Sequence, residues 1–204
     1  DASTALGSGS AVTLNNVSGA SLTLLRDLSV GSLAGSGTTG GHIALGGNTL
    51  TAGGNNTSTT YAGVISGVGS LIKQGTGILT LSGGSTYSGN TTVSGGTLQL
   101  GSAATLGGGT YSGALSITSG ATFDYASTAA QLFTGTVSGA GAVLKSGAGT
   151  LSLLGNNTFS GGVTLSAGTL GVYTNTGAGT GDITLGAGTS MLLGRAVTSV
   201  ANDI

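Results

Sequence analysis

The chain carries the sequence GVGSLIKQGTGILTLSGGSTYSGNTTVSGGTL at residues 67–98 and a related one, GAGAVLKSGAGTLSLLGNNTFSGGVTLSAGTL, at residues 139–170. The two stretches align without a gap, so that each position of the first corresponds to the position 72 further along. Over the wider ranges 61–101 and 133–173, 18 of 41 aligned pairs are identical. Self-similarity at a fixed offset is typical of repeat architectures, in which similar units stack on one another.

A shorter period lies within the long one. An aromatic residue, a small residue and a glycine recur together, and the aromatic members are Tyr61, Tyr87, Tyr111, Phe133 and Phe159. Successive members are 26, 24, 22 and 26 positions apart. Because three steps of 24 make 72, we predict a coil of about 24 residues per turn and interpret the 72-residue repeat as three turns.

Within each unit the apolar residues alternate with polar or small ones. Leu79 and Leu81 flank Thr80, and Leu151 and Leu153 repeat the pattern. A period of two predicts short strands with one buried face, bounded here by corners rich in Gly and Asn. Strands this short cannot bury a face alone, so we expect successive turns to stack in parallel as a β-solenoid.

The composition agrees with this interpretation. The 204 residues include 44 Gly, 27 Ser and 33 Thr but neither Pro nor Cys, and 38% are hydrophobic. Absence of Pro fits a backbone whose N–H groups are committed to strand pairing. We predict one all-β domain over residues 1–204, with about eight turns and a length of about 40 Å. The net charge of −1 gives no electrostatic argument for binding nucleic acid or inserting into a membrane.

The pattern K-x-G-x-G-x-L-x-L-x-G-x-x-x-[YF]-S-G begins at Lys73 and again at Lys145. It resembles the autotransporter-associated β-strand repeat, which is found in the passenger regions of bacterial type V secreted proteins. The resemblance implies a right-handed parallel β-helix and a location outside the cell or on the bacterial cell surface. It also implies that the chain is a fragment, or the processed passenger, of a longer exported protein.

The sequence offers no convincing catalytic, cofactor or metal site. The acidic residues, Asp1, Asp27, Asp124, Asp182 and Asp203, are predicted to lie on different coils, and there is no Glu. Paired-carboxylate hydrolysis needs two such groups close together. One His and no Cys exclude ordinary zinc ligation. We therefore predict a non-enzymatic protein without cofactors, and a β-helix polysaccharide hydrolase is the less favoured alternative.

Two sets of side chains have both a structural and a functional interpretation. Lys73 and Lys145 are predicted to lie three turns apart. They form either a row of cations that binds a ligand or a pair of corner residues, each with its amine reaching out to solvent while its stem covers apolar surface, and the second interpretation is favoured. The five aromatic residues form either a surface ladder that binds sugars or partners, or an internal stack that keeps the coils in register. The aromatic-small-Gly context favours the internal stack.

The sequence supports two functional hypotheses. The leading one is an extracellular structural rod, a passenger stalk or a surface fibre subunit. The alternative is an adhesin that binds a host or cell-surface glycan, or that associates head to tail with itself through its solenoid ends.

Overall fold

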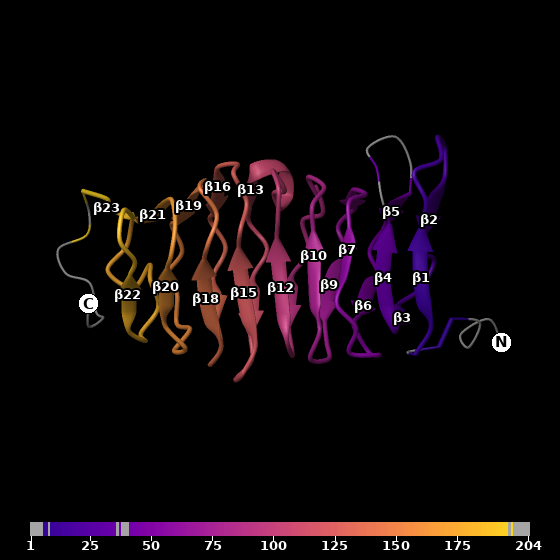
Figure 1. Cartoon of the computed structure of the whole chain (residues 1–204), viewed down its shortest axis with the longest axis horizontal. Helices are drawn as coiled ribbons and strands as arrows, with labels where there is room; N and C mark the ends of the chain where they lie inside the picture. The colour runs from indigo at the N-terminus through magenta and orange to yellow at the C-terminus, as the bar shows by residue number, and fades with distance from the viewer. Residues whose placement is uncertain (1–5, 8, 36, 38–40, 196, 198–204) are drawn as a thin grey trace.

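The computed structural model describes residues 6–7, 9–35, 37, 41–195 and 197, and these form an all-β rod. Short strands stack along one axis, from β1 at one end to β22 and β23 at the other (Figure 1). A single 3-10 turn, η2 (Gly107–Gly109), lies among the described strands. Every strand pairing is parallel, so the predicted parallel β-solenoid is confirmed.

Each turn of the chain visits three faces of the rod in the same order. Face 1 is a nine-stranded sheet of β1 (Ala11–Leu14), β4 (Ser32–Gly35), β7 (Thr59–Tyr61), β10 (Ile78–Leu81), β12 (Thr97–Leu100), β15 (Thr122–Tyr125), β18 (Ala142–Lys145), β20 (Val163–Leu165) and β22 (Ile183–Leu185). Face 2 holds a three-stranded sheet, β2 (Ser21–Thr23), β5 (His42–Ala44) and β8 (Ile65–Ser66), and a five-stranded one, β13 (Thr110–Tyr111), β16 (Gln131–Phe133), β19 (Thr150–Leu153), β21 (Thr169–Val172) and β23 (Ser190–Leu193). Face 3 is a six-stranded sheet of β3 (Leu28–Val30), β6 (Thr49–Ala52), β9 (Ser70–Lys73), β11 (Thr91–Val93), β14 (Leu115–Ile117) and β17 (Val137–Ser138).

The two sheets of face 2 are joined by a stretch that is not itself a strand. Tyr87 donates its backbone N–H to the Ile65 carbonyl of β8. Its ring lies 5.8 Å from the Tyr111 ring of β13, centroid to centroid. The stacking therefore continues through face 2 without a break, although the strand pairing does not.

The turns are shorter and more numerous than the sequence suggested. Face 1 contains nine strands, so the rod has about nine turns where about eight were predicted. The paired residues Thr122 and Ala142 are 20 positions apart, and the offset along this face ranges from 19 to 26. The longer turns carry insertions: the 25-residue offset from Thr97 to Thr122 includes the stretch 101–109 that contains η2.

The 72-residue repeat is not a whole number of turns, and the prediction that it spans three is wrong. β9, in the first copy, lies on face 3, whereas its counterpart β18 lies on face 1. Likewise β10 lies on face 1 and its counterpart β19 on face 2. Because most turns are shorter than 24 positions, one repeat completes three turns and advances one further face. Each copy therefore occupies a different pair of faces.

Alternation along the strands builds one continuous core. On face 1 the inward residues Leu79, Leu98, Phe123, Val143 and Val163 stack in register and are at most 2% exposed. Full burial of such side chains contributes about 1.5–3 kcal/mol each. The core is thus a column that extends along the rod rather than a single compact cluster.

Glycine follows the aromatic residues because the corners of successive turns touch. A Cβ on Gly113 would lie 2.4 Å from the Gly89 carbonyl oxygen and 2.6 Å from the Tyr111 hydroxyl. A Cβ on Gly135 would lie 2.2 Å from the Gly113 oxygen. The contacts with the Gly89 and Gly113 oxygens are backbone contacts that cannot relax cheaply, which explains the third position of the aromatic-small-Gly pattern.

We expect Gly113→Ala to lower the free energy of unfolding by about 1–3 kcal/mol, because the added methyl must push two backbones apart. Chemical denaturation followed by circular dichroism measures this loss. Gly47→Ala is the matched control, since a Cβ there meets nothing within 4 Å and Gly47 has no positive φ. Equal stability of the two variants would contradict the corner-contact explanation.

Candidate functional site

The five aromatic residues singled out by the sequence lie in the interior. Tyr61, Tyr87, Tyr111, Phe133 and Phe159 are each at most 2% exposed. A sugar or a partner protein cannot reach them, so the surface-ladder interpretation is wrong. The rings do not form one stack either: Tyr111 contacts Tyr87 and Phe133, with centroids 5.8 and 5.6 Å apart, while Tyr61 belongs to face 1.

The tyrosine hydroxyls are used inside the rod. The Thr91 hydroxyl lies 2.6 Å from the Tyr87 hydroxyl and 2.7 Å from the Tyr111 hydroxyl. Tyr111 also donates to the Gly89 carbonyl, and Tyr61 donates to the Gly41 carbonyl. Burial raises the pKa of Tyr111 to about 12. Burial likewise raises the pKa values of the phenols of Tyr61, Tyr87 and Tyr125.

These shifts predict a loss of stability in alkali. A phenol whose pKa is raised in the folded state keeps its proton there, while the unfolded chain loses it near pH 10, so stability falls as the pH rises. The pKa values of Lys73 and Lys145 are lowered by burial, which acts in the opposite direction, but only up to their ordinary value of 10.5. We therefore expect the free energy of unfolding to fall between about pH 10.5 and 12, by up to about 1.4 kcal/mol per pH unit for each buried tyrosine.

Absorbance of tyrosinate and circular dichroism, recorded together during an alkaline titration, test this. Most of the tyrosinate signal should rise only as the β signal is lost. Tyr111→Phe, which removes one ionisable group, should reduce the slope of stability against pH. Full tyrosine ionisation near pH 10 in a still-folded rod would contradict the expectation.

Lys73 and Lys145 are buried, and the prediction that their amines reach solvent is wrong. Lys73 is 1% exposed, and its Nζ donates to the carbonyls of Gln74 (2.9 Å), Gly75 (3.0 Å) and Gly95 (3.0 Å). Gln74 and Gly75 belong to the corner that follows β9, whereas Gly95 belongs to the corner one turn further on. The ammonium group therefore binds two successive turns together.

Lys145 repeats this arrangement on the next face of the rod. It is fully buried, and its Nζ donates to the carbonyls of Gly147 and Ala167, the latter at 3.1 Å. These residues are the counterparts of Gly75 and Gly95 in the second copy. Its Nζ also lies 5.3 Å from the centroid of the Tyr125 ring. Burial lowers the pKa of Lys145, and the nearby carboxylate of Asp124 partly offsets that effect.

The sequence contained a signal for these buried lysines. Leu71-Ile72-Lys73 places Lys73 on the same side of the strand as the inward Leu71, and Val143 stands in the same relation to Lys145. At the last inward position of a strand, a long side chain can curl along the corner, where backbone carbonyls lack strand partners. Charge-assisted hydrogen bonds then stabilise the buried ammonium group.

We expect Lys73→Met to lower the free energy of unfolding by about 1.5–3 kcal/mol, since it leaves buried carbonyls without a donor but keeps an apolar stem. Lys73→Ala should cost more, because it also removes the stem. Denaturant titration of both variants, and of Lys145→Met, separates the contribution of the ammonium group from that of the aliphatic stem. A Lys73→Met protein as stable as the parent would show that the ammonium group contributes nothing.

The acidic residues and the histidine do not converge. Asp124 lies on β15, and Asp182 immediately precedes β22, three strands further along face 1 and thus about 14 Å away. Asp27 accepts the Thr49 N–H, and His42 Nδ1 accepts the Val64 N–H. Asp1 and Asp203 lie outside the described residues.

Neither a metal centre nor a membrane-spanning helix is present in the part of the chain that the structure describes. These residues contain no cluster of three or more His, Cys, Asp or Glu side chains suited to a metal ion. No helix among them is long and apolar enough to cross a bilayer.

A polar ladder on the outer surface of face 1 is the most distinctive surface feature. Thr80 Oγ1 donates to Gln99 Oε1 at 3.0 Å, and Gln99 Nε2 donates to Asp124 Oδ2 at 2.7 Å. The Ser146 hydroxyl donates to the other Asp124 oxygen at 2.5 Å. Asp124 is only 5% exposed, so its carboxylate is held by these partners. The ladder joins four successive turns.

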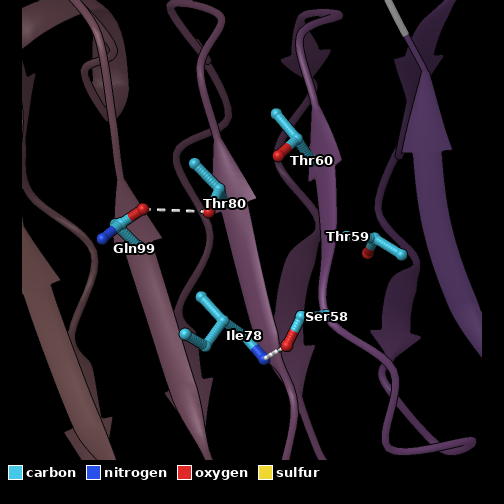
Figure 2. A pocket seen from close by; sticks show the side chains of 6 residues that line it. All are labelled: Ser58, Thr59, Thr60, Ile78, Thr80 and Gln99. Carbon is cyan, nitrogen blue, oxygen red and sulfur yellow. Dashed lines mark hydrogen bonds between the residues drawn. The ribbon is translucent and has the colours of Figure 1, made fainter.

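One end of this ladder borders a shallow hollow of about 230 Å³ (Figure 2). The hollow lies over β7, β10 and β12, and Ile78 contributes an apolar side chain that is 41% exposed. The residues that line it are Ser58, Thr59, Thr60, Ile78, Thr80 and Gln99. Alternation would have placed Thr80, Gln99 and Asp124 outward, but only the strand register shows that they are neighbours.

The fold and the corner chemistry define a parallel β-solenoid built from a recurring strand-corner-strand unit. Residues 71–100 and 143–172 match the family described as passenger-associated-transport-repeat. Over 83 residues, 39% of this chain, the sequence is 47% identical to the adhesin BmaC autotransporter of Brucella suis biovar 1 (strain 1330). No solved structure matches the chain. The chain therefore contains two copies of an autotransporter passenger repeat, which confirms the resemblance seen in the sequence. The match spans 2% of the length of that adhesin.

Proposed function

We propose that this chain is a non-catalytic segment of an autotransporter passenger that acts at the bacterial cell surface or outside the cell as a stiff rod. The observation that carries this proposal is the unbroken stacking of about nine turns over one continuous core. At about 4.8 Å per turn, face 1 spans about 38 Å. Such a rod separates whatever precedes it from whatever follows it.

The composition suits a chain that is exported unfolded and folds outside. It has no Cys to be oxidised prematurely and few charges, and Lys73 and Lys145 become buried only on folding. Folding then needs only local stacking of each turn on the one before it. A rod whose backbone is hydrogen-bonded from turn to turn also resists proteases without disulfides.

Trypsin provides a sharp test, because the chain has only four sites: Arg26, Lys73, Lys145 and Arg195. The two lysines are buried and the two arginines are exposed. After refolding from denaturant, we expect a resistant fragment that ends at Arg195 and begins after Arg26. Mass spectrometry identifies its ends, and the heat-unfolded chain, cut at all four sites, is the control. Cleavage at Lys73 or Lys145 under native conditions, or failure to regain β signal, would contradict a self-folding rod.

A second candidate function is contact with a partner, either another copy of the chain or a glycan. The ends of the rod favour it. β1 and β23 are the outermost strands of their sheets among the described residues, and apolar side chains are exposed near both, including Leu25 (90%), Leu192 (51%) and Leu193 (55%). Such an edge can pair with a further parallel strand, either from another part of the same polypeptide or from a second copy, and self-contact at this edge would be head to tail.

A further inference from the structure

We propose that the hollow on the outer surface of face 1 binds a neutral saccharide. The rod function would stand unchanged if the hollow bound nothing. Three observations carry the assignment. No charged side chain is exposed around the hollow, and Asp124 fixes which atoms of Gln99 and Thr80 donate and which accept. The hollow also combines hydroxyl groups with one exposed apolar side chain.

The body of the rod presents no exposed charged side chain. Between residues 28 and 181 the sequence contains only Lys73, Asp124 and Lys145 as charged residues, and none is more than 5% exposed. An anionic glycan or a phosphate would find no cation there, and a cationic partner would find no free carboxylate. The surface chemistry therefore matches a ligand that is neutral and rich in hydroxyl groups.

The ladder determines which hydrogen bonds the hollow can offer. A carboxylate only accepts, so Asp124 holds the Gln99 amide with its Nε2 toward Asp124 and its Oε1 toward Thr80. Thr80 must then donate to Gln99, which leaves the lone pairs of its hydroxyl oxygen able to accept. Thr60, the register partner of Thr80 on the neighbouring strand β7, has no partner for its hydroxyl among the described residues and can donate or accept. A ligand hydroxyl group, itself donor and acceptor, fits both.

Ile78 gives the hollow an apolar surface beside these hydroxyls. It is 41% exposed and lies on the same strand as Thr80 (Figure 2). A sugar ring has the same duality, with an apolar C–H face and a rim of hydroxyl groups. The volume of about 230 Å³ lies below the range of about 300–1,000 Å³ for drug-sized ligands, which suits a single ring with the remaining glycan outside.

The ladder is not part of the stacking machinery of the repeat. In the second copy Ser152 replaces Thr80 and Gly171 replaces Gln99, so no equivalent ladder forms. The inward neighbours are kept: Leu79 corresponds to Leu151. Both copies stack in register, so the strand register of the repeat does not require an outward ladder.

The test is an NMR titration of the 204-residue chain with the methyl glycosides of glucose, galactose, mannose and N-acetylglucosamine. We expect concentration-dependent shifts of the Thr60, Thr80 and Gln99 amide signals for at least one glycoside, with a dissociation constant in the millimolar range that one small ring can reach. Thr80→Val and Gln99→Leu should each weaken binding about five- to tenfold, as for the loss of one hydrogen bond. Thr164→Val, at an outward position on the same face beyond the hollow, should leave it unchanged.

Asp124 acts through Gln99 and is tested separately. Asp124→Asn can donate as well as accept, so it frees the Gln99 amide to reverse. We expect the Gln99 side-chain NH₂ signals to move and the affinity to fall, measured at a temperature at which the variant keeps the β signal of the parent. If the Gln99 side-chain NH₂ signals of the Asp124→Asn variant match those of the parent, Asp124 does not fix the orientation of the Gln99 amide.

Sialic acid and glucuronate distinguish neutral from acidic ligands. Binding of these acids but of no neutral glycoside would overturn the proposal. The same holds if no glycoside shifts the three amides at the highest concentration that dissolves, or if the Thr80 and Gln99 variants bind as tightly as the parent. None of these outcomes affects the tryptic pattern, so failure of the hollow and failure of the rod are distinguishable.

Discussion

The corners, not the strands, impose the constraint on which the rod depends. Strand N–H and C=O groups pair with the turns on either side, but at a corner the backbone bends away while the next corner lies only about 4.8 Å further along. Two features of the sequence accommodate these closely spaced corners. Glycines such as Gly113 let corner backbones touch, and long interior side chains with a donor at the tip, such as Lys73 and Tyr61, reach the corner carbonyls.

These corner contacts explain why the offset between the two copies of the repeat need not be a whole number of turns. In the first copy β9 pairs with β11 and β10 with β12, so the segment 71–100 contains two stacked corners and their lysine. The strand pairings and the lysine hydrogen bonds of the unit lie within the unit itself, so the same sequence can fold on any face of the rod. The second copy, β18 to β21, is built in the same way one face further round. The repeat is thus a stacked corner rather than a set of turns.

The same distinction shows what the sequence could and could not predict. Alternation placed Leu79, Leu81 and their counterparts inward correctly, since a period of two is a property of one strand. The predicted turn length was too long partly because the two spacings of 26 each include a step to the next face. Tyr61 lies on face 1, Tyr87, Tyr111 and Phe133 lie on face 2, and Phe159 lies beside β17 of face 3. The charge of Lys73 predicts an exposed side chain, whereas its place in the alternation predicts a buried one, and the structure follows the alternation. The ladder from Thr80 to Asp124 needed the register between turns, which insertions such as 101–109 make irregular.

Because inward and corner residues specify the fold, the outward residues are free to differ between copies. Leu98 corresponds to Leu170, whereas outward Gln99 corresponds to Gly171, on strands of equal length and pairing. A binding surface can therefore arise or disappear through outward substitutions without disturbing the stack. The one-face advance of the repeat adds a geometric consequence, since successive copies present their outward residues in different directions. A passenger built of such copies would surround its axis with related but non-identical surfaces while keeping a single stiff core.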